Sequence, residues 1–310
     1  MDRVVAGAKR IEELGFDTLW VRDHLIWKPH GMEGTERTFL DGFLTLAAMA
    51  AVTKRIALGT AVLIPIRWPL NVAQCFGTLS FLGGGRLIHA GFGIGSNPKE
   101  LGGAGFDAAD REPIFIETIE ICRQAWSNGT VNFHGAHFDV DDVTLAPMPT
   151  SEMITWYGGS TRAAVRRSVQ YCDGWLPGRF PFTSFDARIK YMRELDEAAG
   201  KTTRIGAIPL MFLDEKSRDS ARSKIDVAAL AHSSEGSTQW IKPSSGDFKT
   251  IEDLAGLLIV GNIDECFEEI AKFAARGVDE MVFDVRLQFD RYEEIIEEIG
   301  SALLPKLRKL

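Results

Sequence analysis

Two spacings of hydrophobic residues alternate along this chain and predict alternating strands and helices. Residues 2–14 place apolar side chains every three or four positions, the spacing of a helix with one buried face. Residues 17–21 and 56–64 are short apolar runs that contain β-branched residues, which is typical of buried strands. By the same criteria we expect further strands at 87–92, 154–157, 174–176, 205–213 and 280–285. Further helices are expected at 40–53, 69–82, 110–127, 162–171, 185–199, 214–232, 264–276 and 292–310.

The regular order of strand and then helix implies a parallel sheet. We therefore expect a (β/α)8 TIM barrel, as a single domain over residues 1–310 with excursions at about 96–108, 131–150 and 233–256. Residues 132–140 predict a small hairpin within the second excursion. Such a barrel needs eight strands, but the chain opens with a helix, so the first strand is expected to be absent from this chain. An open, doubly wound sheet is the alternative fold.

Composition and charge narrow the possible partners. The net charge of −8 provides no basic stripe, which argues against a nucleic-acid partner. No apolar run approaches the roughly 18 residues of a membrane span, and the first residues do not resemble a signal peptide. The four cysteines lie far apart, as expected for reduced thiols. A cytoplasmic protein without a membrane partner is the expectation.

The first candidate site residues follow the predicted strand 17–21. Asp23 and His24 come directly after it, and the carboxyl ends of parallel strands are where ligands gather in α/β folds. Histidine titrates near neutral pH, so His24 could take or give a proton while a hydride moves elsewhere. Asp23 could orient the imidazole or bind a polar edge of a ligand. The alternative is a polar pair that only caps the strand.

Small residues mark the ends of the next two strands. Gly59 to Val62 suggests a bulge or a close approach of the backbone, although a simple kink in a core strand is an alternative. The segment 91–97 has glycine at alternate positions, which would let a flat or phosphorylated group approach the backbone. It does not have the GxGxxG spacing of a dinucleotide-binding loop, and Pro98 argues against a helix directly after it.

A candidate anion site follows the predicted strand 154–157. Gly158, Gly159, Ser160 and Thr161 lead into a helix, where free backbone amides and the helix dipole favour a phosphate. An ordinary serine or threonine helix cap is the alternative.

Other kinds of site find less support. His134 and His137 are three residues apart on the predicted hairpin without a third ligand, so we expect no metal. No GxSxG motif or Ser/His/Asp arrangement is evident, which argues against the hypothesis that the protein is a hydrolase.

Taken in order, several segments resemble the luciferase-like flavin and deazaflavin oxidoreductases. They span nearly the whole chain, and the specificity lies in their order and spacing rather than in one motif. The segments are EELGFDTLWVRDHL, LAAMAAVTKRIALGTAV, GGGRLIHAGFGIGSNPKELGGAGFD, NFHGAHFDV with the following LAPMP, WYGGSTRAAVRRSVQYCDGWLPG and GNIDECFEEIAKFAARGVDEMVF.

The resemblance implies a role for each matching position. Asp23 and His24 match an acid–histidine pair beside the isoalloxazine or deazaflavin ring, with His24 as the group that handles a proton. Ala61-Val62 matches a site where many members carry a cis peptide bond at the ring. The remaining matches line the ring and ribityl chain or bind the cofactor phosphate: Ile94, Gly95 and Asn97 for the former, Gly158, Gly159, Ser160 and Thr161 for the latter.

The choice of cofactor follows from the same resemblance. A single Asp-His pair is similar to the branch that uses coenzyme F420, whereas many FMN monooxygenases have Glu-His-His there. Coenzyme F420 is therefore expected, with FMN as the alternative. Members that oxidise glucose 6-phosphate carry a glutamate after the glycine that matches Gly95. Here that position is Ser96, which argues against this substrate.

Three functions stay open. The first is hydride transfer between coenzyme F420 and a small organic substrate. The second is a two-component monooxygenase that uses reduced FMN, supplied by a separate reductase, and oxygen. The third is a non-catalytic flavin-binding protein. The resemblance also implies a homodimer.

Overall fold

The computed structural model describes residues 2–26, 39–233 and 240–310, and these form two compact units. The N-terminal unit contains most of the chain up to Tyr157. The C-terminal unit runs from Gly158 to Leu310 and includes residues 13–16. Each unit is described by itself below.

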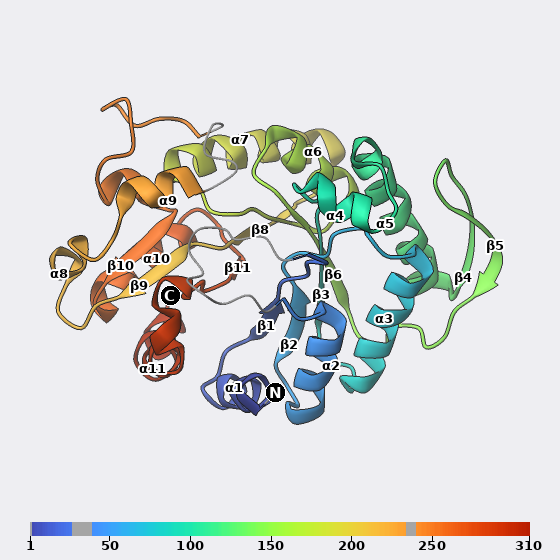
Figure 1. The fold of residues 1–310 in the computed structure, drawn as a ribbon, viewed down its shortest axis with the longest axis horizontal. Helices are drawn as coiled ribbons and strands as arrows, with labels where there is room; N and C mark the ends of the chain where they lie inside the picture. Colours follow the sequence, from blue (N-terminus) through green and yellow to red (C-terminus); the bar gives the residue numbers. More distant parts are fainter. Residues whose placement is uncertain (1, 27–38, 234–239) are drawn as a thin grey trace. The chain divides into compact units, whose positions relative to one another are not determined.

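Parallel strands form the centre of the N-terminal unit (Figure 1). Their order in the sheet is β1-β2-β3-β6, and each neighbouring pair is parallel. Every residue of β2 and β3 is buried, as expected for strands covered on both faces. The bounds are β1 (Thr18–Val21), β2 (Ala57–Thr60), β3 (Ile88–Phe92) and β6 (Met153–Gly158).

Helices α2, α3 and α5 lie along the strands of this unit (Figure 1). The first of them begins where the Asp41 side chain accepts a hydrogen bond from the N–H of Leu44, and α5 ends at Gly129 in the left-handed conformation. The bounds are α1 (Asp2–Glu13), α2 (Gly42–Val52), α3 (Pro69–Leu82), α4 (Pro98–Gly103), a 3-10 turn (Ala108–Asp110) and α5 (Arg111–Asn128).

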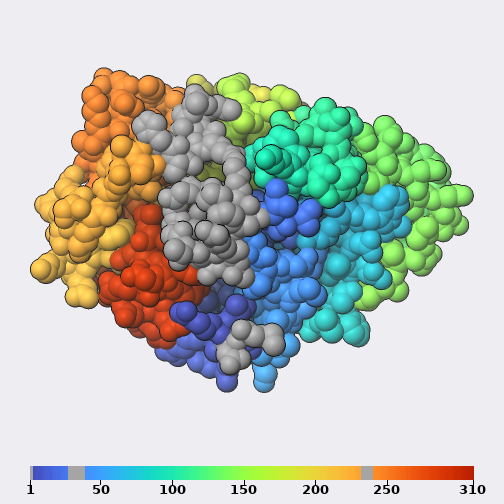
Figure 2. Space-filling model, in the orientation of Figure 1, coloured from blue at the N-terminus to red at the C-terminus, as the bar shows by residue number. Residues whose placement is uncertain are grey.

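The predicted hairpin is confirmed as an antiparallel pair, β4 (Thr130–His134) and β5 (Asp139–Thr144). It lies at the surface beside α5 (Figure 2). The buried carboxylate of Glu117 on α5 accepts hydrogen bonds from the backbone N–H groups of residues 136, 137 and 138 at 2.9 to 3.3 Å. These bonds hold the tip of the hairpin on the helix.

The C-terminal unit contains two groups of parallel strands. One has the order β7-β8-β11, and the other pairs β9 with β10. A bridge between Leu210 and Asp284 connects β9 to the segment after β11. The bounds are β7 (Gly174–Leu176), β8 (Arg204–Ala207), β9 (Leu210–Leu213), β10 (Leu258–Gly261) and β11 (Glu280–Met281).

Two expectations about these strands were wrong. The predicted strand 205–213 is divided between β8 and β9, because Pro209 has no N–H to donate to a ladder and the two halves pair with different neighbours. Strand β10 was not predicted, since its three hydrophobic residues, Leu258, Ile259 and Val260, belong to a longer apolar run that periodicity cannot assign.

The predicted helix 214–232 was also wrong. It is divided into α8 (Arg218–Arg222) and α9 (Val227–Ser233). The Ser217 hydroxyl caps α8 by accepting a hydrogen bond from the N–H of Ser220, and Asp226 accepts one from the N–H of Ala229. Two capping side chains inside one apolar pattern start two short helices in place of a long one.

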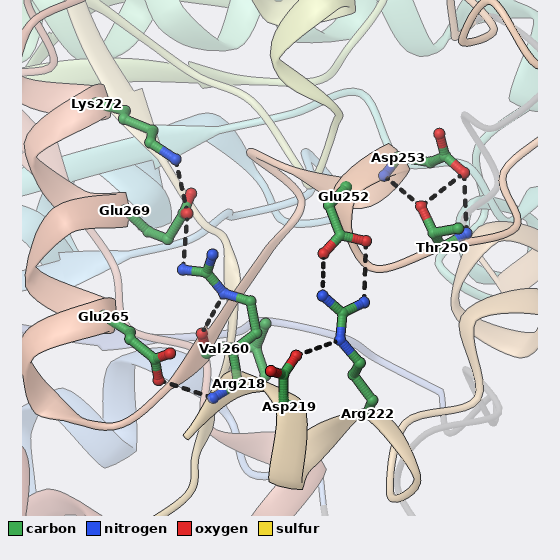
Figure 3. A network of polar contacts seen from close by, with 10 residues as sticks. All are labelled: Arg218, Asp219, Arg222, Thr250, Glu252, Asp253, Val260, Glu265, Glu269 and Lys272. Carbon is green, nitrogen blue, oxygen red and sulfur yellow. Dashed lines mark hydrogen bonds and ion pairs between the residues drawn. The ribbon is translucent and has the colours of Figure 1, made fainter. Parts of the chain in front are cut away.

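Ion pairs and hydrogen bonds join α8 to β10 and α10 (Figure 3). The guanidinium of Arg218 binds the carbonyl oxygen of Val260 and the carboxylate of Glu269, and the backbone N–H of Arg218 donates to Glu265 at 2.7 Å. Arg222 pairs with Glu252, which lies in the 3-10 turn before β10. This network fixes the elements that surround β10.

The remaining helices match their predicted positions within a few residues, apart from the C-terminal one, which contains a π-helical turn. No helix among the described residues is long and apolar enough to cross a bilayer. The excursion expected from 233 is partly outside the described residues, and its described part contains Trp240 and Phe248, which pack in the core cluster of β9 and β10. The bounds are α6 (Arg162–Tyr171), α7 (Phe182–Ala199), a 3-10 turn (Glu252–Leu254), α10 (Ile263–Ala274), a 3-10 segment (Arg286–Arg291), α11 (Tyr292–Glu298), the π-helical turn (Ile299–Leu303) and α12 (Leu304–Leu307).

Candidate active site

The carboxyl ends of β1, β2 and β3 share one edge of the N-terminal sheet, because neighbouring strands in it are parallel. The segments that follow these strands are tied together by backbone hydrogen bonds. Leu63 donates its N–H to the oxygen of Gly91 at 2.8 Å, and Gly93 donates to the oxygen of Leu63 at 2.9 Å. The predicted residues His24, Val62 and Ile94 therefore follow adjacent strand ends, and each of them is partly exposed.

Asp23 is buried and its carboxylate is held by Arg67. The two guanidinium nitrogens of Arg67 lie 2.5 and 2.8 Å from the two carboxylate oxygens, and the N–H of Gly42 lies 3.3 Å from one of them. Arg67 also binds Asp41 at 2.7 Å. Burial alone would lower the pKa of Arg67, but the hydrogen bonds and charges of Asp23 and Asp41 raise it. Asp23 thus fixes the segment after β1 to the start of α2.

His24 has a different acidic partner from the one next to it in the sequence. Its Nδ1 lies 3.3 Å from both carboxylate oxygens of Glu100, a side chain on α4 that is 2% exposed. One of these oxygens also accepts a hydrogen bond from the backbone N–H of Leu25 at 2.6 Å. The imidazole is 30% exposed, and its centroid lies 5.3 Å from that of Phe39. A partly exposed imidazole is thus held at its Nδ1 atom by a buried carboxylate.

Glu100 was not identified from the sequence, although a signal for it exists. Asn97, Pro98 and Glu100 occupy the cap, first and third positions of α4, a pattern typical of a helix start. The expectation that Pro98 prevents a helix here was wrong, because proline at the first position replaces an N–H that would have no partner within the helix.

The other predicted residues of this unit occupy the same strand ends. The carboxamide oxygen of Asn97 caps α4 by accepting a hydrogen bond from the N–H of Lys99 at 3.2 Å. Gly95 has φ +71°, and a Cβ there would lie 3.0 Å from Ile64. The peptide bond between Ala61 and Val62 is cis.

The loop from Gly158 to Thr161 belongs to the C-terminal unit. Gly159 has φ +133°, and its carbonyl oxygen accepts a hydrogen bond from the indole N–H of Trp175 at 2.8 Å. The Thr161 hydroxyl caps α6 by accepting one from the N–H of Ala164 at 3.0 Å, as the alternative interpretation expected. All four loop residues are partly exposed.

Two arginines make the start of α6 electropositive. Arg188 donates from Nε to the carbonyl oxygen of Ser160 at 3.1 Å, and Arg162 lies over the ring of Tyr191 at 3.6 Å. Burial lowers the pKa of Arg188, and the charge of Arg162 lowers it further. A helix N-terminus next to two mutually repelling guanidinium groups favours a bound anion. The shared contact of this loop and His24 with one ligand stays a prediction.

Comparisons with known proteins agree with the family that the sequence resembles. The family model of luciferase-like monooxygenases matches residues 1–280. An F420-dependent glucose-6-phosphate dehydrogenase of Amycolatopsis mediterranei is 26% identical over 322 residues, which cover 99% of this chain and 95% of the relative.

Two solved structures share the fold over nearly the whole chain. Monooxygenase RslO1 from Streptomyces bottropensis has a TM-score of 0.76 at 20% identity, with 99% of this chain and 93% of that chain covered. An F420-dependent secondary alcohol dehydrogenase in complex with an F420-acetone adduct has a TM-score of 0.73 at 21% identity, with coverage of 96% and 92%. The predicted luciferase-like barrel class is thereby confirmed.

Proposed function

Because this chain belongs to the luciferase-like monooxygenase family, we propose that it transfers a hydride between coenzyme F420 and a small organic substrate. The observation that carries the proposal is the partly exposed imidazole of His24, held by the buried carboxylate of Glu100 at the end of β1. The names of the relatives that depend on F420 support this choice of cofactor.

The residues of the two units fit the chemistry of this cofactor. Small and apolar residues at the ends of β2 and β3 suit a flat, tricyclic ring, and the loop at the start of α6 with Arg162 and Arg188 suits a phosphate. When bound, the deazaflavin supplies the acceptor or donor of a hydride. The residues proposed at the ring are Ala61, Val62, Ile94, Gly95 and Asn97, and those proposed at the phosphate are Gly158, Gly159, Ser160 and Thr161.

His24 is the catalytic residue of the proposal, and Asp23 is a positioning residue. Oxidation of an alcohol removes a hydride from carbon and a proton from oxygen, and His24 would take that proton. In the opposite direction the same side chain would return it. Both carboxylate oxygens of Asp23 bind Arg67, so Asp23 would influence His24 only by holding the backbone that the two residues share.

Glucose 6-phosphate is not the substrate that we propose. Ser96 occupies the position at which members with that activity carry a glutamate, so the carboxylate expected for that substrate is missing here. The substrate that we propose is a small molecule that bears a hydroxyl or a carbonyl group.

Replacement of His24 by alanine tests its role in proton transfer. We expect kcat to fall by at least about 100-fold, since positioned acid–base groups contribute about that much or more, while the Kd for F420 stays within about twofold. Turnover is measured as the loss of oxidised F420 absorbance, without oxygen, over a panel of small alcohols. Equal turnover by the wild type and the variant would contradict the role of His24.

A two-component FMN monooxygenase is the second candidate, supported by the monooxygenase among the structural neighbours. It would consume oxygen when a separate reductase supplies reduced FMN. Oxygen uptake with FMN, and no anaerobic turnover with F420, would favour it. Binding of cofactor without turnover of either kind would indicate a non-catalytic flavin-binding protein.

A homodimer is also part of the proposal. Exposed apolar side chains on α2 and α3 support it, and light scattering of the purified protein measures the mass. These side chains are Leu44, Phe81 and Leu82.

A further inference from the structure

We propose that Glu100 is a positioning residue that fixes the tautomer of His24, so that Nε2 is the nitrogen that exchanges the proton with the substrate. This inference rests on the proposed function for its chemistry. It rests on geometry alone for the tautomer, which can be measured without cofactor.

The contacts of Glu100 define its role as an acceptor. The backbone N–H of Leu25 can only donate, and it lies 2.6 Å from one carboxylate oxygen. The same carboxylate faces Nδ1 of His24, with both oxygens at 3.3 Å. An ionised carboxylate has no proton to give, so it favours the tautomer that carries its proton on Nδ1. In a neutral imidazole the other nitrogen, Nε2, is then the acceptor.

Asp23 cannot do the same for His24. Its two oxygens are taken up by Arg67, at 2.5 and 2.8 Å, and its side chain is fully buried. The acid that acts on the histidine is therefore 76 residues away in the sequence and comes from a different loop.

Local structure keeps the Glu100 carboxylate in place. Asn97 caps α4 and Pro98 fixes its first turn, so Glu100 stands at the third helical position. Its bond to the N–H of Leu25 joins α4 to the segment that carries His24. The ring of Phe39, at 33° to the imidazole plane, packs beside it and restricts its rotation.

The tautomer determines which atom meets the substrate. In the oxidising direction Nε2 would take the proton from the substrate's hydroxyl oxygen while the carbon that bears this oxygen gives up its hydride to the bound cofactor, which would leave a carbonyl group. If Nε2 carried the proton instead, it could not accept the proton of the substrate's hydroxyl group, and oxidation of the alcohol would be slower.

The experiment is two-dimensional ¹H–¹⁵N NMR of histidine-labelled protein without cofactor, at a pH at which the imidazole is neutral. The His24 signals are identified by their loss in His24→Gln. In the wild type we expect a protonated Nδ1. In Glu100→Gln the amide oxygen can still accept the hydrogen bond from the N–H of Leu25, while the amide NH2 group can donate to Nδ1, so we expect the population to shift towards the Nε2–H form. Glu100→Asp, which keeps a carboxylate, should partly restore the Nδ1–H form.

Activity provides the second measurement. We expect Glu100→Gln to lower kcat by about 100-fold with KM and the Kd for F420 within about twofold, whereas a structural role would move all three. Glu117→Gln, another buried carboxylate of the same unit, is the matched control and should keep the wild-type tautomer. An Nε2–H form in the wild type, or no shift in Glu100→Gln, would overturn the inference. If neither protein binds F420 while the tautomer shifts as expected, the proposed function fails and the positioning by Glu100 stands.

Discussion

At the scale of single residues, acidic side chains in this protein act on groups that are distant in the sequence. Asp23 and His24 were predicted from the sequence as a pair because they are adjacent and follow a strand. Both residues do follow the end of a strand, as predicted, but they do not bind each other. Asp23 binds Arg67, and the carboxylate that binds His24 belongs to Glu100. Asp23 and His24 lie in the irregular segment after β1, and each binds a residue far along the chain, so proximity in the sequence could not reveal these partners.

A buried aspartate in the C-terminal unit makes stability depend on acid. Asp284 binds both Arg179 and Arg286, the latter at 2.8 Å. Burial raises the pKa of Asp284, but the charges and hydrogen bonds of the two arginines outweigh this and lower it below its usual value of 3.8. The charged form is therefore favoured by folding, so this stabilisation is present above about pH 3.8 and is lost as the pH falls below it.

We predict that Asp284→Asn lowers the free energy of unfolding by about 3 kcal/mol at neutral pH, because two arginines lose their buried partner. The difference between the wild type and the variant should become smaller as the pH falls from 4 towards 2, and urea unfolding at several pH values measures it. A difference that stays constant over this range would show that Asp284 does not cause the acid dependence.

At the scale of elements, the sequence predicts regular segments well and interrupted ones poorly. The bounds of α3, α6 and β7 agree with their predicted ranges, because each is one periodic run that ends at a glycine, proline or cap. The predicted strand 205–213 and helix 214–232 were divided by Pro209 and by the caps Ser217 and Asp226. Apolar periodicity continues through such residues, whereas backbone hydrogen bonding does not.

The hairpin β4–β5 depends on one helical side chain. Glu117 accepts three backbone N–H groups at the hairpin tip, and a Cβ on Gly135 would lie 2.4 Å from its carboxylate, so only glycine leaves room there. We predict that Glu117→Ala speeds hydrogen exchange of the amides of residues 136–138 by about 10-fold or more, since each charge-assisted bond contributes about 1.5–3 kcal/mol. The exposed Glu120 on the same helix gives the control, because Glu120→Ala should leave these rates unchanged. Unchanged exchange in Glu117→Ala would contradict the anchoring role.

At the scale of the whole molecule, the order of segments identified the family and the barrel class, and it did so without any single decisive motif. The loop from Gly158 to Thr161 was predicted as a phosphate site from its glycines and hydroxyl residues, but its contact with Arg188 was not predicted, since Arg188 lies 28 residues after Ser160 on another helix. Contacts between elements of this kind arise from the fold and leave no local pattern in the sequence.

Calorimetric titration of the purified protein with coenzyme F420 and with FMN tests the central claim most directly. We predict that F420 binds at least about 10-fold more tightly than FMN, and that Arg188→Met weakens F420 binding by about 10-fold, the effect of about 1.4 kcal/mol lost at the phosphate. Tighter binding of FMN, or binding of neither cofactor, would contradict the account.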